Sequence, residues 1–158
     1  MSGEIEIPGL YISSSVKEVV RVMTGLELNE IKFLSEDGGA VDEQITGLLI
    51  MAGEFNILLS LGMPRDTAVM LAVYMTGIEK SQLSDYELND CVAELTNMIA
   101  GQLKTQLAAG GSHFKNLPPI VVNGNDYDIV HKSKVENKCK RFRAGSMDFV
   151  FKAHYLNS

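Results

Sequence analysis

The chain has 158 residues, of which 46% are hydrophobic and 22% are charged, with a formal net charge of −6. This length fits one domain over residues 1–158, and the apolar content excludes a disordered chain. No apolar run approaches the roughly 20 residues of a membrane-spanning helix, and the acidic N-terminus MSGEIEIPG does not have the pattern of a signal peptide. Because two cysteines form no disulfide framework, a cytoplasmic protein with no membrane partner is expected.

Charge is unevenly distributed along the chain. Residues 1–100 carry 5 basic and 16 acidic side chains, whereas residues 101–158 carry 9 and 4. The acidic total argues against a dedicated nucleic-acid-binding protein. Much of the basic excess lies in residues 131–143, where charged and apolar residues alternate. Solvated faces of exposed strands account for this pattern, because lysines on edge strands block edge-to-edge pairing.

The first elements are predicted to be a helix and a strand. Ser13–Ser15 are N-cap candidates for a helix that runs through Met23, with Gly25 as its stop. Residues 27–36 have the pattern of a first strand.

An apolar hairpin and a second helix follow. Residues 44–52 and 54–62 are apolar segments separated only by Gly53, which predicts two strands joined by a tight turn. Pro64 suits the first turn of a helix that ends near Gly77.

The third helix has the clearest signals. Ser84 and Glu87 have the spacing of a capping box, and Gly110-Gly111 predicts an end near Ala109. Its apolar stripe consists of Leu88, Val92, Leu95, Ile99 and Leu103, flanked by Cys91, Met98 and Leu107. After Pro118-Pro119, the strand-like segments are IVVNG and roughly residues 126–143 and 147–156. The order of elements predicts an α+β domain with one antiparallel sheet under long helices.

A polar stripe runs along the opposite face of the third helix. Its members recur at spacings of three and four: Glu87, Asp90, Glu94, Asn97, Gly101 and Lys104. Glu94 and Asn97 lie about 4.5 Å apart along the axis, so both side chains can reach one partner. Gly101 replaces a helix-favouring residue at a cost of ~1 kcal/mol and leaves a gap where another molecule can approach the backbone.

Two interpretations of this stripe are open from the pattern alone. Polar stripes on surface helices are ordinary, and solvation explains them. Alternatively, the amide of Asn97 can hold a water molecule, as the water-orienting glutamine of GTPases does. An amide cannot carry protons, so a partner must then supply the electrophile, the metal and the charge stabilisation.

The segment DCVAELTNMIAGQLKTQL, residues 90–107, resembles the signature helix of the CheC/CheX/FliY family of chemotaxis phosphatases, and most closely its CheX members. The family pattern is Asp or Ser, three residues, Glu, two residues, Asn; Asp90, Glu94 and Asn97 fill it. The flanking residues up to Lys104, the LPPIVVNG segment and the order of elements also look like CheX. The resemblance spans roughly residues 8–156 and implies a CheC/CheX-like fold.

The resemblance implies a phosphatase that hydrolyses the aspartyl phosphate of a CheY-type response regulator. By position, Asn97 would orient the attacking water, Glu94 would pair with a lysine of the regulator, and Asp90 would support them. The chain would need no cofactor of its own, because Mg²⁺ would belong to the regulator's active site. Homodimers that share sheet strands are also implied, although nothing in the sequence fixes the interface. Alternatives are a non-catalytic CheX-fold module that binds a receiver domain, or a flagellar switch component.

An internal comparison bears on the subfamily. CheC-type members carry two signature helices, and here Ser14 and Glu18 have the right spacing but Arg21 stands where the second asparagine would be. Whether this partial match is a relic or chance, Arg21 cannot present an amide to water. One competent site favours a CheX-like protein over a CheC-like one.

Other reactive side chains have ordinary interpretations. His113, His131 and His154 are far apart and have no metal-ligand spacing, so no metal site is expected. Cys91 lies beside the apolar stripe and is interpreted as a small buried hydrophobe. Cys139, among basic residues, would have a lowered thiol pKa if exposed.

Overall fold

The computed structural model describes residues 6–32, 41–125, 127 and 137–156. It contains three α-helices, namely α1 (Gly9–Thr24), α2 (Arg65–Thr76) and α3 (Asp85–Ala109), and a short 3-10 helix η1 (Lys80–Gln82). The strands are β1 (Asn29–Ile31), β2 (Ile45–Ala52), β3 (Asn56–Met63), β4 (Lys115–Asn116), β5 (Ile120–Asn123), β6 (Asn137–Ala144) and β7 (Met147–Leu156). The predicted α+β fold class is confirmed.

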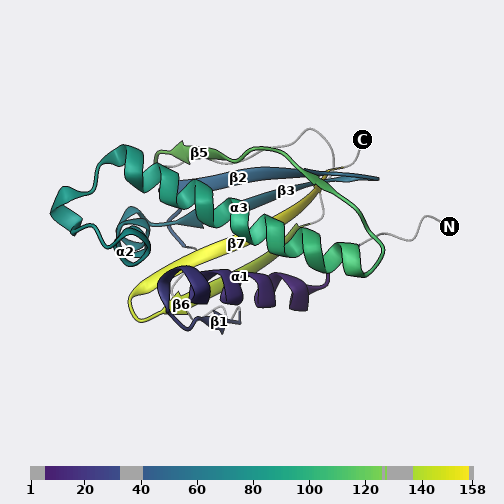
Figure 1. Ribbon diagram of the computed structural model, residues 1–158, viewed down its shortest axis with the longest axis horizontal. Coiled ribbons are helices and arrows are strands. Elements are labelled where there is room, and N and C mark those ends of the chain that lie inside the picture. The colour runs from purple at the N-terminus through teal and green to yellow at the C-terminus, as the bar shows by residue number, and fades with distance from the viewer. Residues whose placement is uncertain (1–5, 33–40, 126, 128–136, 157–158) are drawn as a thin grey trace.

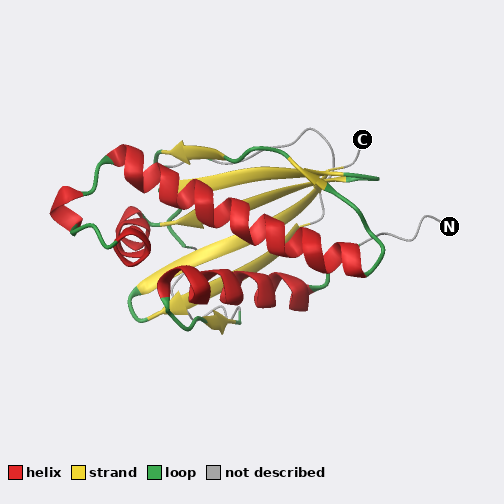
Figure 2. Cartoon of the chain, in the orientation of Figure 1, coloured by secondary structure: helices red, strands yellow, loops and turns green. Residues whose placement is uncertain are grey.

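One antiparallel sheet joins all seven strands in the order β1-β6-β7-β3-β2-β4, with β5 also paired to β2. The long α3 crosses the sheet diagonally, and α1 lies beside it on the same face and runs in the opposite direction (Figure 1). Figure 2 shows this arrangement as a layer of helices over a layer of strands. Among the described residues, no helix combines the length and apolar character needed to cross a membrane.

The core lies between the helices and the sheet. Alternate residues of a strand point to the same face, and on β3 the residues Ile57, Leu59 and Leu61 are fully buried. Phe142 of β6 stacks on Phe149 of β7 with ring centroids 5.6 Å apart. The predicted apolar stripe of the third helix is buried against this layer, with Met98 only partly buried.

The first helix begins earlier than the serine residues indicated. Pro8 is the N-cap residue and α1 starts at Gly9, so the prediction that Ser13–Ser15 cap the helix is wrong. Ser13 instead donates a hydrogen bond to the carboxylate of Glu30, and Ser15 accepts one of 2.6 Å from Gln106 of α3. These serines serve tertiary contacts, which local capping rules do not detect.

The hairpin is confirmed, but its turn is longer than Gly53 alone. β2 and β3 pair from Ala52 opposite Asn56, which leaves residues 53–55 in the turn. Phe55 turns inward, where its ring meets that of Phe114 edge-on at 5.3 Å. The second helix is confirmed, and its stop at Gly77 adopts a left-handed conformation with φ 72°.

The described part of the basic segment is not a solvated strand face. β6 lies between β1 and β7 and is therefore not an edge strand. Lys140 pairs with Glu30 of β1 at 3.3 Å, and Arg141 pairs with Asp148 at 2.5 Å. The side chain of Arg141 is only 10% exposed. The interpretation as solvated strands is wrong here because Glu30 of β1 and Asp148, across the β6–β7 hairpin, supply acidic partners. Residues 131–136 lie outside the described residues, as do 33–36 of the predicted first strand.

Candidate functional site

The α3 helix is held firmly at its start. The predicted capping box is confirmed: Ser84 Oγ accepts a 3.1 Å hydrogen bond from the Glu87 N–H, and the Glu87 carboxylate accepts one of 3.0 Å from the Ser84 N–H. Two backbone donors at the helix start are thereby satisfied. The predicted polar stripe therefore projects from one continuous helix of 25 residues with a capped start.

The outer face of α3 carries the residues that the sequence analysis singled out. Asp90, Glu94, Asn97 and Lys104 are exposed, and Gly101 is half-exposed. Within the described part of the chain, the side chains of Glu94 and Asn97 make no hydrogen bond or ion pair. Both groups are thus available to another molecule.

Glu94 and Asn97 form the centre of this face. Three residues along an α-helix correspond to about 4.5 Å of rise and about 60° of rotation, so the carboxylate and the amide project on the same side. Gly101 follows about 6 Å further along the axis. A Cβ added at Gly101 would meet nothing within 4 Å, so the backbone there faces open space.

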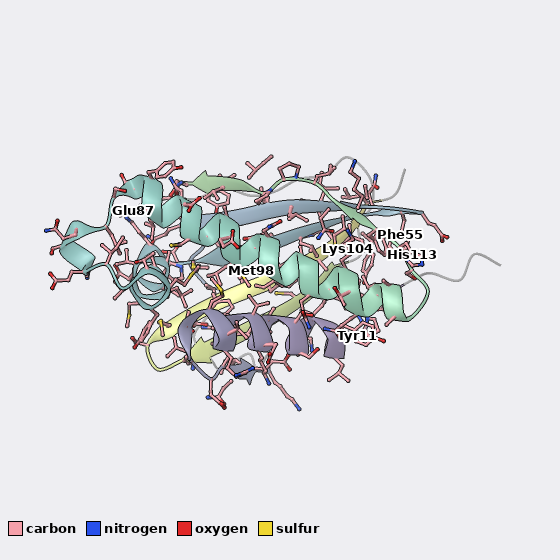
Figure 3. The ribbon with its side chains drawn as sticks, viewed as in Figure 1. Tyr11, Phe55, Glu87, Met98, Lys104 and His113 are labelled. Carbon is pink, nitrogen blue, oxygen red and sulfur yellow. The ribbon has the colours of Figure 1, made fainter. Side chains whose placement is uncertain are left out.

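Two members of the predicted stripe lie near opposite ends of α3, as Figure 3 shows for Glu87 and Lys104. Glu87 is half-buried, and its carboxylate is used in the capping box. It is therefore not a free group of the stripe, which makes Asp90 and Glu94 its accessible acids. Lys104 lies about 10.5 Å beyond Asn97 along the axis.

The helix lies close to the sheet at the level of Asn97. Gly47 of β2 faces α3, and a Cβ at this position would collide with Thr96 Oγ1 and lie 3.0 Å from Thr96 Cβ. Thr96 is fully buried and donates a 2.8 Å hydrogen bond to the Val92 carbonyl. Gly47 thus allows the close approach that fixes the height of the neighbouring Asn97. This pair could not be predicted from the sequence, because no local signal links residues 49 positions apart.

The partial second motif lies on α1. Arg21 Nη2 donates to Glu18 Oε1 at 2.8 Å, so the only acid of this motif is already paired within its own helix. Ser14 lies beside Gln106 of α3, with Gln106 Nε2 3.2 Å from Ser14 Oγ. This arrangement offers neither an amide nor a free carboxylate at the positions equivalent to Asn97 and Glu94.

The cysteines and histidines lie away from this centre. Burial, followed by the negative charges of Asp90, Glu87 and Glu94, raises the pKa of the Cys91 thiol. The predicted buried role of Cys91 is confirmed. Burial also raises the pKa of Cys139, which is half-buried, so the condition of exposure for a reactive thiol is not met.

The histidine positions are separate in the fold. His113 precedes β4 and His154 lies on β7, whereas His131 lies outside the described residues. Among the residues that the structure describes, no three His, Cys, Asp or Glu side chains gather as a metal site.

One exposed residue on the same face was missed. Tyr86 precedes Asn97 by eleven residues, which is three helical turns plus about 20°. The spacing was readable from the sequence, but its exposed fraction of 79% was not.

Comparison with known proteins places this geometry in a family. The family described as "Chemotaxis phosphatase CheX" matches residues 45–143, which include β2, β3 and all of α3. A protein from Thermotoga maritima described as "CheY-P phosphatase CheX" is 29% identical over 116 residues, covering 73% of this chain and 74% of that protein.

Solved structures share the fold over nearly the whole chain. Chemotaxis protein CheX from Vibrio vulnificus superimposes with a TM-score of 0.83 at 24% identity, covering 99% of this chain and 100% of that one. A CheX-CheY-BeF3-Mg complex from Borrelia burgdorferi has a TM-score of 0.72 at 21% identity, covering 97% and 100%. With its matching fold, its signature helix and a family match over more than half of its length, the chain belongs to the chemotaxis phosphatase CheX family.

Proposed function

We propose that this chain accelerates hydrolysis of the aspartyl phosphate on a CheY-type response regulator. The observation that carries the proposal is the pair Glu94 and Asn97, exposed one turn apart on α3 and without partners among the described residues. Family membership supports it, and so does the name of the Thermotoga maritima relative, a CheY-P phosphatase. Hydrolysis of this phosphate would terminate a chemotaxis or related two-component signal in the cytoplasm.

Asn97 acts by placing water. Its amide donates and accepts hydrogen bonds but does not take up a proton, so it orients a water molecule in line with phosphorus. The water oxygen bonds to phosphorus, the bond from phosphorus to the aspartyl oxygen breaks, and both protons of the water leave on inorganic phosphate. The regulator regains a free carboxylate. An oriented water reacts faster because its entropy is lost on binding and not in the reaction step.

The other residues of the stripe hold the regulator. Glu94 pairs with a lysine of the regulator, Asp90 supports the acidic side of the contact, and Gly101 lets the partner approach the helix backbone. Lys104 marks the basic end of the same contact. Mg²⁺ and the groups that stabilise charge on the phosphoryl oxygens belong to the regulator's own active site, so this chain contributes position and not charge.

The test is the decay of a phosphorylated CheY-type regulator with Mg²⁺, with and without this protein. The wild type is expected to shorten the lifetime of the phosphate, and Asn97→Ala to abolish that effect. Asn89→Ala is the matched control, because Asn89 is an amide on the same helix that is turned toward β5, where Asn123 donates to it at 2.9 Å. Full activity in Asn97→Ala contradicts the mechanism. Binding without any acceleration by the wild type favours a non-catalytic module.

We also infer that two copies associate through the edge of the sheet formed by β5. Among the described residues, this short strand pairs only with β2, and Ile120 at its start is 64% exposed. An unprotected edge with an exposed apolar side chain favours pairing with another strand. Light scattering is expected to give twice 17.3 kDa for the wild type and 17.3 kDa for Ile120→Asp. A monomeric wild type refutes this arrangement.

A further inference from the structure

The side chain of Tyr86 is the most exposed large hydrophobic one among the described residues, at 79%. Among the described residues, its ring forms no pair with another aromatic ring, and its hydroxyl makes no hydrogen bond. Tyr86 lies in the first turn of α3, where a tyrosine offers no capping group. Packing within this chain therefore gives no reason for an aromatic side chain at this position.

The position of Tyr86 relates it to the proposed site. It lies about 16.5 Å before Asn97 along the helix axis and within about 20° of the same direction. Asp90 and Glu94 lie between the two. The acids next to Tyr86 are held within the chain, because Asp85 pairs with Arg65 and Glu87 closes the capping box. Tyr86 is thus the apolar end of a face whose centre is acidic.

The length of this face matches one docked domain. A protein interface of standard size covers about 800 Å² on each partner, which is a patch about 30 Å across. A domain centred on the docking residue Glu94 therefore extends about 15 Å each way along α3, which includes Tyr86 at about 12 Å on one side and Lys104 at about 15 Å on the other. Tyrosine is among the residues that most often dominate binding energy at such interfaces.

We propose that Tyr86 is a positioning residue whose ring packs against the receiver domain of the regulator during hydrolysis. This inference rests on the proposed function. The polar contact at Glu94 by itself leaves the regulator free to rotate about that point, whereas an apolar anchor about two helical turns away restricts the rotation. Tyr86 acts through the placement of the regulator, so its loss weakens binding and leaves the chemistry at Asn97 intact.

The experiment measures the rate of dephosphorylation against the concentration of phosphorylated regulator. Tyr86→Ala is expected to raise KM about tenfold with kcat within about twofold of the wild type, and Tyr86→Phe to keep KM within about twofold. Leu10→Ala is the matched control, because Leu10 is 74% exposed but lies on α1. Its KM is expected to be unchanged. An unchanged KM in Tyr86→Ala, or an equal rise in Leu10→Ala, overturns the inference.

A binding measurement separates this inference from the proposed function. The probe is a CheY-type regulator activated with beryllofluoride and Mg²⁺, titrated with each variant in the absence of turnover. If the wild type binds without accelerating hydrolysis, the phosphatase proposal fails, and a tenfold weaker Tyr86→Ala still supports the docking role. If Tyr86→Ala binds as tightly as the wild type, the docking role fails whatever the activity.

Discussion

Gly101→Ala is expected to stabilise the protein and to impair its activity. Gly101 lies inside α3 and is not among the glycines with positive φ, so alanine fits its backbone conformation. A Cβ there meets nothing within 4 Å. Replacing a glycine inside a helix by alanine raises the free energy of unfolding by about 0.8 kcal/mol. For a chain of this length, that gain corresponds to a rise in Tm of about 2–4 °C.

The same methyl group occupies the space through which the regulator is proposed to approach. A partner in contact with the helix backbone must retreat by about the length of one carbon–carbon bond, and an error of 1 Å in the placement of reacting groups can cost about 10²-fold in rate. We therefore expect kcat/KM to fall by one to two orders of magnitude in Gly101→Ala, and further in Gly101→Leu. The α3 helix is expected to remain stable in both variants.

Two assays on the same samples test this reasoning. Urea denaturation gives the change in stability, and the decay of the phosphorylated regulator gives the change in activity. Stability is expected to rise and activity to fall. The stability depends on α3 within this chain, whereas the activity depends on how closely the regulator approaches α3. A Gly101→Ala protein that is more stable and fully active shows that no partner approaches the helix at this point, and the proposed docking face is then wrong.

Three further predictions concern the sheet, an ion pair and docking. Gly47→Ala is expected to lower the free energy of unfolding by about 2 kcal/mol through its collision with Thr96, and Thr96→Ala in that background to recover part of the loss in urea denaturation; no recovery contradicts the collision. Burial alone would raise the pKa of Asp148, but hydrogen bonds and charge from Arg141, with a smaller part from a second arginine, hold it below its usual value. The stabilisation is therefore present above the unfolded pKa of about 3.9 and is lost as pH falls through the folded value. Asp148→Asn is expected to lower the free energy of unfolding by about 2 kcal/mol at pH 7 and by progressively less below pH 4. A loss of stability that does not change with pH refutes this. Glu94→Ala is expected to raise KM several-fold and to weaken its dependence on salt; unchanged steady-state kinetics argue against a docking role.

The sequence by itself determined the element that carries the proposed site. The start of α3 at Ser84, its buried stripe and its exposed face all depend on contacts within one or two helical turns, and helical periodicity is visible in any single sequence. The prediction that Glu94 and Asn97 lie exposed on one face was confirmed for the same reason.

Only the tertiary structure decided how distant segments use their polar groups. Ser13 was predicted to cap α1 and instead donates to Glu30 of β1, and Lys140 was predicted to be solvated and instead pairs with the same carboxylate. Such pairings depend on which strands become neighbours in the sheet, and that is set by burial of the whole core and not by local preference. The close fit of Gly47 under Thr96 belongs to the same class, because the need for a glycine arises only when α3 lies on β2.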